Sequence, residues 1–244
     1  GGLGFDYKWD MGWMNDTLNY FRTAPSYRTA EYHKLTFSMA YYYQERYLLP
    51  LSHDEVVHGK ATIMQKMYGD YDGKFPQARA FYMYMYAHPG KKLNFMGNEI
   101  GQLREWDEKR EQDWCLLSYP AHDGFFHFMA DLNHFYLEHS SLWEQDYEEG
   151  GFQWLDCHQE EKCIYAFERR SRKERLVAVF NFSDKKVDDF VLKVPGAEAL
   201  IPVFSSDLEM YGGSSREKRA KIKGEYQLFQ IDMSPYSALY FTVK

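Results

Sequence analysis

The 244-residue sequence predicts an α/β part followed by an all-β part. In the first half, short strand-like runs alternate with longer helical runs, which is the pattern of βα units built around a parallel sheet. From about residue 140 the strand-like runs become short and follow one another with turn signals between them. We therefore expect residues 1–139 to form one domain and residues 140–244 to form a second domain, a β-sandwich.

The first βα unit is predicted to begin with a strand over residues 4–9, GFDYKW. A helix is predicted over residues 15–22, with Asn15 as its N-cap, because a short polar side chain there can accept a hydrogen bond from the first turn. A second helix is expected between residues 28 and 43.

The next unit begins with a predicted strand over residues 47–52. Pro50 has no backbone N–H group, so we expect a bulge or the end of the strand at that position. Residues 77–87 are apolar nearly all round, as in a buried helix, and the sequence HPG that follows stops this helix. A third strand is predicted over residues 92–97, and Glu99 stands at its carboxyl end.

The last predicted helix covers residues 125–136, where aromatic and aliphatic side chains recur at helical spacing. Six strands are predicted after it: residues 152–155, 163–167, 176–182, 190–192, 226–231 and 238–241. Two basic clusters, residues 169–173 and 216–223, fall between strands. We interpret both as solvated hairpin tips and not as contacts for nucleic acid.

The composition narrows the classes of partner. A formal net charge of −7 argues against broad attraction to nucleic acid or to an anionic membrane surface, so neither is expected as a partner. Aromatic residues make up 18% of the chain, and such rings can stack on sugar faces, although most of them are expected to fill the core.

The cysteine residues and the start of the chain support further expectations about cellular location and chain length. Cys115, Cys157 and Cys163 are an odd number without metal-type spacing, which favours a reducing compartment, a cytoplasmic location and no bound metal. No apolar run approaches the roughly 20 residues that span a bilayer. The chain opens with Gly1 and runs straight into dense hydrophobic sequence, so we expect a fragment of a longer protein.

Residues 51–60, LSHDEVVHGK, are the most informative segment for function. A His-Asp-Glu cluster after a strand could bind a metal, act as acid and base, or hold a substrate, and a plain surface turn would look similar. Its place at the carboxyl end of a predicted strand favours an active site, because functional groups gather at that end of parallel strands.

This ten-residue string closely resembles the fourth conserved region of the α-amylase family, in the form typical of 1,4-α-glucan (glycogen) branching enzymes. Residues 4–18, 89–99 and 104–106 agree with the same family. The resemblance covers most of residues 4–115 and continues more loosely through the all-β part. It implies the last three βα units of a TIM (β/α)8 barrel followed by a carboxyl-terminal β-sandwich.

The resemblance also implies roles for two residues. Asp54 corresponds to the family's transition-state-stabilising carboxylate, and His53 to the histidine that binds a sugar hydroxyl in the donor subsite. The family breaks an α-1,4 bond by retaining double displacement, with an aspartate nucleophile and a glutamate acid/base, and branching enzymes pass the chain to a 6-hydroxyl, forming an α-1,6 branch. No segment here matches the motifs that hold those two carboxylates, so the isolated chain is expected to be inactive.

Four further residues are candidates for binding an α-glucan such as glycogen or amylose. Trp9, Trp13 and Trp106 could stack on sugars or could simply pack in the core or a loop. Glu99 is expected to form hydrogen bonds or to have a structural role near the site, and not to be catalytic. The resemblance implies no metal and no organic cofactor.

Three functions remain open from the sequence. The chain could be the distal part of a branching enzyme, a free-standing glucan-binding module, or part of a hydrolase or another transferase of the same family. The first is favoured, because the Glu-Val-Val-His-Gly-Lys sequence after Asp54 resembles branching enzymes specifically. Three strands of a barrel would leave open edges, so oligomerisation is also expected.

Overall fold

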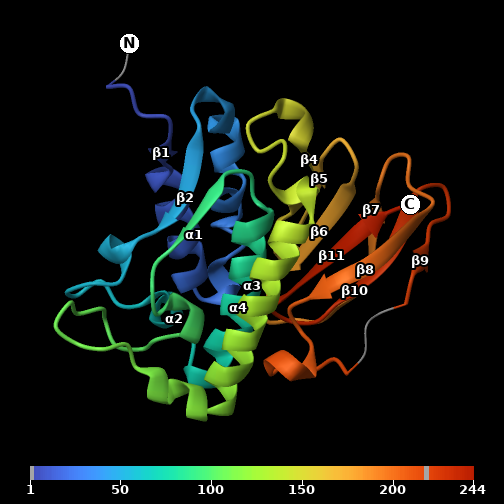
Figure 1. Cartoon of the computed structure of the whole chain (residues 1–244). Helices are drawn as coiled ribbons and strands as arrows, with labels where there is room; N and C mark the ends of the chain where they lie inside the picture. Colours follow the sequence, from blue (N-terminus) through green and yellow to red (C-terminus); the bar gives the residue numbers. More distant parts are fainter. Residues whose placement is uncertain (1–2, 217–219) are drawn as a thin grey trace.

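A computed structural model describes residues 3–216 and 220–244 of the chain. A small parallel sheet and its helices occupy one side of the molecule, and antiparallel strands occupy the other, with the long helices between the two (Figure 1). Within the described ranges, none of the helices combines the length and the apolar character that crossing a membrane requires.

The parallel sheet has three strands in the order β1-β2-β3: β1 (Lys8–Trp9), β2 (Tyr47–Leu51) and β3 (Lys91–Asn94). Four α-helices accompany it: α1 (Met11–Arg22), α2 (Ile63–Lys66), α3 (Tyr71–Ala87) and α4 (Pro120–Glu138). The alternation of strands and helices that the sequence predicts is therefore present, with shorter strands than expected.

The three predicted helices that are present in the structure all begin earlier than expected, and α4 begins at Pro120 instead of residue 125. α1 begins at Met11, and its N-cap is Asp10, whose carboxylate accepts a hydrogen bond from the Trp13 amide at 2.8 Å, so Asn15 lies inside the helix. α3 begins at Tyr71, six residues before the predicted start, with Asp70 as its N-cap. Pro76 lies within its second turn, which explains why the sequence pattern placed the start after this proline.

The predicted helix between residues 28 and 43 is also wrong, because this segment forms three short 3-10 turns: Tyr32–Leu35, Phe37–Ala40 and Tyr42–Gln44. Aromatic and β-branched residues are common here and favour the α-helix only weakly. Tertiary contacts decide instead, since the buried Tyr32 donates its hydroxyl to the Ile164 carbonyl at 2.6 Å.

Pro50 neither forms a bulge nor ends its strand, because β2 continues to Leu51 in unbroken register with β3. The Asp10 amide donates to the Leu48 carbonyl at 2.9 Å, so the backbone N–H and C=O groups of the even-numbered residues of β2 point toward β1. Strand β1 has already ended at the level of Pro50, and no ladder bond is lost there.

The all-β part contains a six-stranded sheet in the order β4-β5-β6-β11-β8-β9 and a two-stranded sheet, β10-β7. The strands are β4 (Phe152–Gln159), β5 (Ile164–Arg170), β6 (Arg175–Asn181), β7 (Val187–Lys193), β8 (Ala199–Ser205), β9 (Ile222–Lys223), β10 (Leu228–Met233) and β11 (Ser237–Val243). The six predicted strands are present, whereas β8 and β9 were not predicted. Pro202 within β8 weakened its strand pattern, and the ladder shifts register next to it.

The central strands of the six-stranded sheet, β5, β6 and β11, are buried on both faces. In β6, Leu176, Ala178 and Phe180 pack toward the helices, where one continuous core contains them. Val177 and Val179 face the other way and form a second core with the two-stranded β10-β7 sheet. Side chains alternate between the faces with a period of two, so a nearly continuous apolar strand serves both cores.

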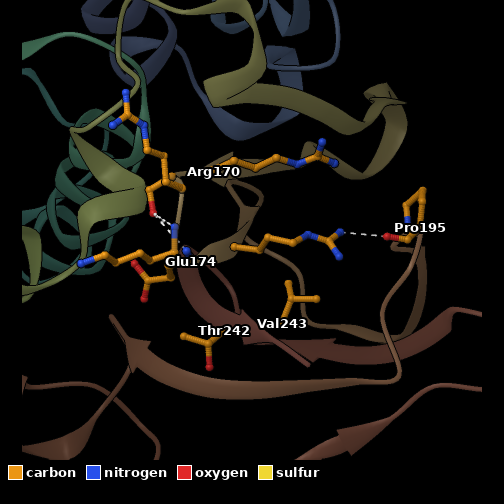
Figure 2. A pocket seen from close by; sticks show the side chains of 9 residues that line it. Arg170, Glu174, Pro195, Thr242 and Val243 are labelled. Carbon is orange, nitrogen blue, oxygen red and sulfur yellow. Dashed lines mark hydrogen bonds between the residues drawn. The ribbon is translucent and has the colours of Figure 1, made fainter.

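The hairpin between β5 and β6 carries the first basic cluster. Its residues 170–175 line an open pocket of about 690 Å³ together with Pro195, Thr242 and Val243 (Figure 2). The cations there are largely compensated, because the guanidinium groups of Arg170 and Arg175 both pair with the buried Glu168. Residues 217–219 of the second basic cluster lie outside the described residues.

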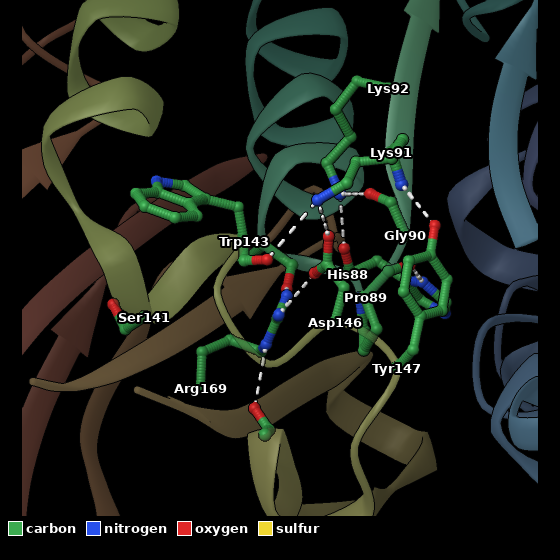
Figure 3. Close-up of polar contacts among 12 residues, drawn as sticks. His88, Pro89, Gly90, Lys91, Lys92, Ser141, Trp143, Asp146, Tyr147 and Arg169 are labelled. Atoms are coloured by element: carbon green, nitrogen blue, oxygen red, sulfur yellow. Dashed lines mark hydrogen bonds and ion pairs between the residues drawn. The ribbon is translucent and has the colours of Figure 1, made fainter. Parts of the chain in front are cut away.

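Arg169 contradicts the prediction of a solvated tip, because it is fully buried in β5. Its guanidinium pairs with the buried Asp146 at 2.7 Å and donates to the carbonyl groups of Ala87 and Gly151 (Figure 3). A buried arginine needs such partners, and only the fold supplies them.

Candidate functional site

The carboxyl end of β2 presents His53 and Asp54. A 3-10 turn, His53–Glu55, follows the strand, and the Ser52 hydroxyl caps it by accepting a hydrogen bond from the Asp54 amide at 3.3 Å. The His53 Nε2 atom lies 3.1 Å from a carboxylate oxygen of Asp54. Their side chains are 51% and 59% exposed, so the pair is open to a ligand.

The ring of His53 lies beside the rings of Phe95 and Trp106. Both residues belong to the segment that follows β3, the strand next to β2. The centroid of the His53 ring is 5.9 Å from that of Phe95 and 6.5 Å from that of Trp106, and the latter two rings meet edge to face. The Phe95 amide donates to the Leu51 carbonyl at 2.9 Å, which joins the ends of the two strands. The fold thus places Trp106 beside His53, where it is partly buried, and its role in sugar binding stays a prediction.

The other two tryptophans have different surroundings. Trp9 ends β1 at the same edge of the sheet and is 39% exposed, but no ring contact within the described residues joins it to His53 or Trp106. Trp13 is only 1% exposed and stacks on Tyr84 in the helix layer. Trp13 therefore belongs to the core, and the prediction that it could stack on sugar is wrong.

Glu99 lies in a 3-10 turn, Asn98–Ile100, just after β3. Its negative charge and, to a larger extent, burial raise the pKa of Tyr82 well above the ordinary value. Asn94 connects this turn to the core, since its side-chain oxygen accepts hydrogen bonds from Tyr82 at 3.2 Å and from Asn98 at 3.0 Å. The role of Glu99 stays a prediction.

Asp10 is a buried carboxylate that sequence reasoning missed. It follows β1 directly and accepts hydrogen bonds on Oδ1 from the Trp13 amide and, at 2.7 Å, from the Tyr41 hydroxyl. Burial raises its pKa, although these hydrogen bonds oppose the shift. Its Oδ2 atom has no partner among the described residues. A polar residue between a strand and the helix pattern after it was the available signal.

Metal binding has no candidate group in the described part of the chain, where no three His, Cys, Asp or Glu side chains converge in a suitable way. The site instead offers one imidazole, one carboxylate and aromatic rings on a solvent-open edge. Such groups can accept and donate hydrogen bonds to hydroxyls and contact an apolar sugar face.

Comparison of the sequence with known proteins gives two kinds of match. Residues 154–244 match the family described as "Alpha amylase, C-terminal all-beta domain". The chain is 43% identical over 250 residues to the 1,4-alpha-glucan branching enzyme GlgB of Halothermothrix orenii, covering 99% of this chain and 40% of that protein. It is 48% identical over 219 residues to GlgB 1 of Clostridium perfringens strain 13, covering 88% of this chain and 32% of that protein. The chain thus spans less than half the length of the curated relatives it matches.

Comparison of the structure points the same way at the level of fold. AmyP in complex with maltose superposes with a TM-score of 0.71 at 11% identity, over 100% of this chain and 52% of that one. The α-amylase from H. orenii superposes with a TM-score of 0.65 at 15% identity, over 99% of this chain and 49% of that one. These matches show an α-amylase type of fold.

Proposed function

Since this chain is a homologue of the carboxyl-terminal part of 1,4-alpha-glucan (glycogen) branching enzymes of the α-amylase family, we propose that it forms part of such an enzyme and contributes to its donor subsite. The observation that carries the proposal is the exposed His53–Asp54 pair at the carboxyl end of β2. The substrate would be an α-glucan such as glycogen or amylose, and the setting cytoplasmic.

In the proposed reaction the enzyme cleaves an α-1,4 bond and transfers the chain to a 6-hydroxyl, with retention through two displacements. Asp54 would stabilise the oxocarbenium-like transition state through the ring hydroxyls, and His53 would donate a hydrogen bond to the sugar. The nucleophile and the acid/base belong to motifs that nothing in these 244 residues matches. Trp9, Glu99 and Trp106 would contribute to substrate binding.

The same proposal accounts for the parallel sheet. The strands β1, β2 and β3 with α1, α3 and α4 would be the last three βα units of a (β/α)8 barrel, and the antiparallel strands the accessory β-sandwich. The carboxyl ends of the strands would then form the catalytic face of the barrel.

The test uses a chimera in which this chain replaces the matching part of the Halothermothrix orenii branching enzyme, which is 43% identical to it. The chimera should form α-1,6 branches on amylose, measured by loss of iodine colour and by debranching. Asp54→Asn should lower turnover about 1,000-fold or more with maltoheptaose binding retained, because only transition-state stabilisation is removed. Asp72→Asn, an exposed carboxylate in the first turn of α3, is the matched control.

Turnover that survives Asp54→Asn would refute the role of Asp54, and release of linear sugars without branches would favour a hydrolase. The isolated chain should form no α-1,6 linkages, because both displacement carboxylates are missing from it. Branch formation by the isolated chain would overturn that expectation. Tight binding of maltoheptaose by the isolated chain without any turnover of the chimera would favour a glucan-binding module.

A further inference from the structure

We infer that Glu105 and Lys66 are positioning residues for the His53–Asp54 pair, acting through the loop of residues 55–61, whose backbone they both bind. This inference rests on the proposed function, since it concerns the placement of the same pair. Neither residue was singled out individually from the sequence.

The backbone of the loop of residues 55–61 adopts conformations that are unfavourable without stabilising contacts. His58 and Ala61 have φ values of 38° and 61°, in the left-handed region that residues other than glycine rarely adopt, and Gly59 between them has a φ of 83°. Such conformations persist when surrounding contacts impose them, and they cluster at functional sites.

Glu105 supplies some of those contacts. Its two carboxylate oxygens accept hydrogen bonds from the amides of Gly59 at 2.8 Å and Ala61 at 2.7 Å. These two bonds lower the pKa of the Glu105 carboxyl group, so it is ionised at neutral pH. The next residue adds a third bond, because the Trp106 amide donates to the Val56 carbonyl at 2.8 Å.

Lys66 supplies further contacts to the same loop. It is only 3% exposed, and its ammonium group donates to the carbonyl of Glu55 and, at 3.0 Å, to that of Ala61. Burial lowers its pKa to about 8. The short helix α2 fixes its position, since Thr62 and Gln65 form a reciprocal capping box at the start of that helix.

The loop is coupled directly to the catalytic pair. Glu55, whose carbonyl Lys66 binds, is the last residue of the turn that contains His53 and Asp54. The Val56 amide donates to the His53 carbonyl at 3.0 Å, while the Trp106 ring lies beside the His53 ring. A shift of the loop would therefore displace the Asp54 carboxylate, and a misplacement of about 1 Å at a reacting centre can cost about 100-fold in rate.

The test is a double-mutant cycle in the chimera described above. Glu105→Gln, which turns one acceptor oxygen into a donor, should lower kcat at least tenfold and leave KM within about twofold. Its Tm should fall by only a few degrees, because one hydrogen bond to the loop is lost while the core is untouched. In the Asp54→Asn background Glu105→Gln should have little further effect, because it acts through Asp54. Lys66→Met, which keeps the volume and removes the donors, should behave in the same way. Glu108→Gln, an exposed carboxylate on the same segment, is the control.

If Glu105→Gln lowered kcat equally in the unmutated chimera and in the Asp54→Asn chimera, or raised KM alone, the inference would be overturned. A readout independent of turnover uses this chain itself: the side-chain NMR resonances of His53 should shift in Glu105→Gln and not in Glu108→Gln. Unchanged His53 resonances in both Glu105→Gln and Lys66→Met would also overturn it. An inactive unmutated chimera would count against the proposed function, while the NMR result would still decide this inference.

Discussion

The buried side chain of His88 makes the stability of the fold depend on pH. It is fully buried at the carboxyl end of α3, among the rings of Trp13, Tyr42 and Tyr84. Its Nδ1 atom lies 2.8 Å from the Pro89 carbonyl and must donate to it, so Nε2 is left to accept from the Ser38 hydroxyl, also at 2.8 Å. Burial lowers the pKa of His88 to about 3, so the ring is neutral in the folded chain.

The folded chain should lose stability as the pH falls below about 6.5, because the unfolded chain then binds a proton at His88 that the folded chain does not bind. Between pH 6.5 and pH 5 this group should remove about 2 kcal/mol from the free energy of unfolding. Urea unfolding at several pH values measures the slope. His88→Gln should flatten it, and His127→Gln, an exposed histidine in α4, should not. Equal slopes in all three proteins would contradict the assignment.

At the scale of elements, buried charge joins segments that are distant in the sequence. Asp146 lies before β4, Arg169 lies in β5, and Lys91 opens β3, and the Asp146 carboxylate pairs with both cations (Figure 3). The positive charges of these neighbours, together with Lys92, hold the pKa of Asp146 below its usual value despite its burial, which alone would raise it. The cluster connects the amino end of β3 to the antiparallel sheet.

Asp146→Asn should lower the free energy of unfolding by about 3–5 kcal/mol, because it leaves the buried Arg169 without its countercharge. Chemical denaturation at neutral pH measures the change. Glu148→Gln, an exposed carboxylate two residues away, should change stability by less than about 0.5 kcal/mol. A loss below about 1 kcal/mol for Asp146→Asn would mean that the ion pair is not important for holding these elements together.

At the scale of the whole molecule, the parallel sheet has unpaired edges. The amides of Lys8 and Asp10 donate to carbonyls at positions 46 and 48, so the backbone of Tyr7 and Trp9 faces away from β2. No further strand pairs with β1 in the described residues, and exposed apolar side chains are frequent in β1 and the residues next to it in the sequence: Leu3, Phe5, Tyr7, Trp9 and Met11. An unpaired apolar edge invites pairing with another chain.

The isolated chain should therefore form concentration-dependent oligomers, detected by light scattering. Tyr7→Pro should reduce them, because it removes an outward N–H group without touching the bonds to β2. An exposed substitution away from the edge, Val191→Ala in β7, should leave them unchanged. A monodisperse monomer at all concentrations would contradict the prediction.

Much of the fold could be predicted because its signals are local. Alternation of strand-like and helical runs indicated the βα units, and apolar runs with turns between them indicated six of the eight antiparallel strands. The failures are local patterns that distant contacts override. A helix was predicted between residues 28 and 43, yet hydrogen bonds such as that from Tyr32 to Ile164 fix 3-10 turns there instead.

The residues of the candidate site also fall into two groups, those that the sequence indicated and those that only the structure identified. His53 and Asp54 could be named from the sequence because they belong to one contiguous motif, whereas only the structure shows their side chains 3.1 Å apart. Trp13 was misjudged, since only packing against Tyr84 shows that its face of α1 points into the core. Glu105 could not be connected to the loop after Asp54, because its contacts span 44 and 46 positions in the sequence. The contacts of Lys66 span only 11 and 5 positions, but no sequence pattern showed that its ammonium group is buried against this loop.

The sequence by itself determined the succession of structural classes, the family resemblance and the identity of the pair His53 and Asp54, because these depend on local periodicity and on a contiguous motif. The tertiary structure alone decided which charges are buried, which tryptophan lies in the core and which side chains hold the loop after Asp54. The physical reason is that burial and hydrogen bonding are shared between distant segments, and no single segment encodes both partners of such a contact.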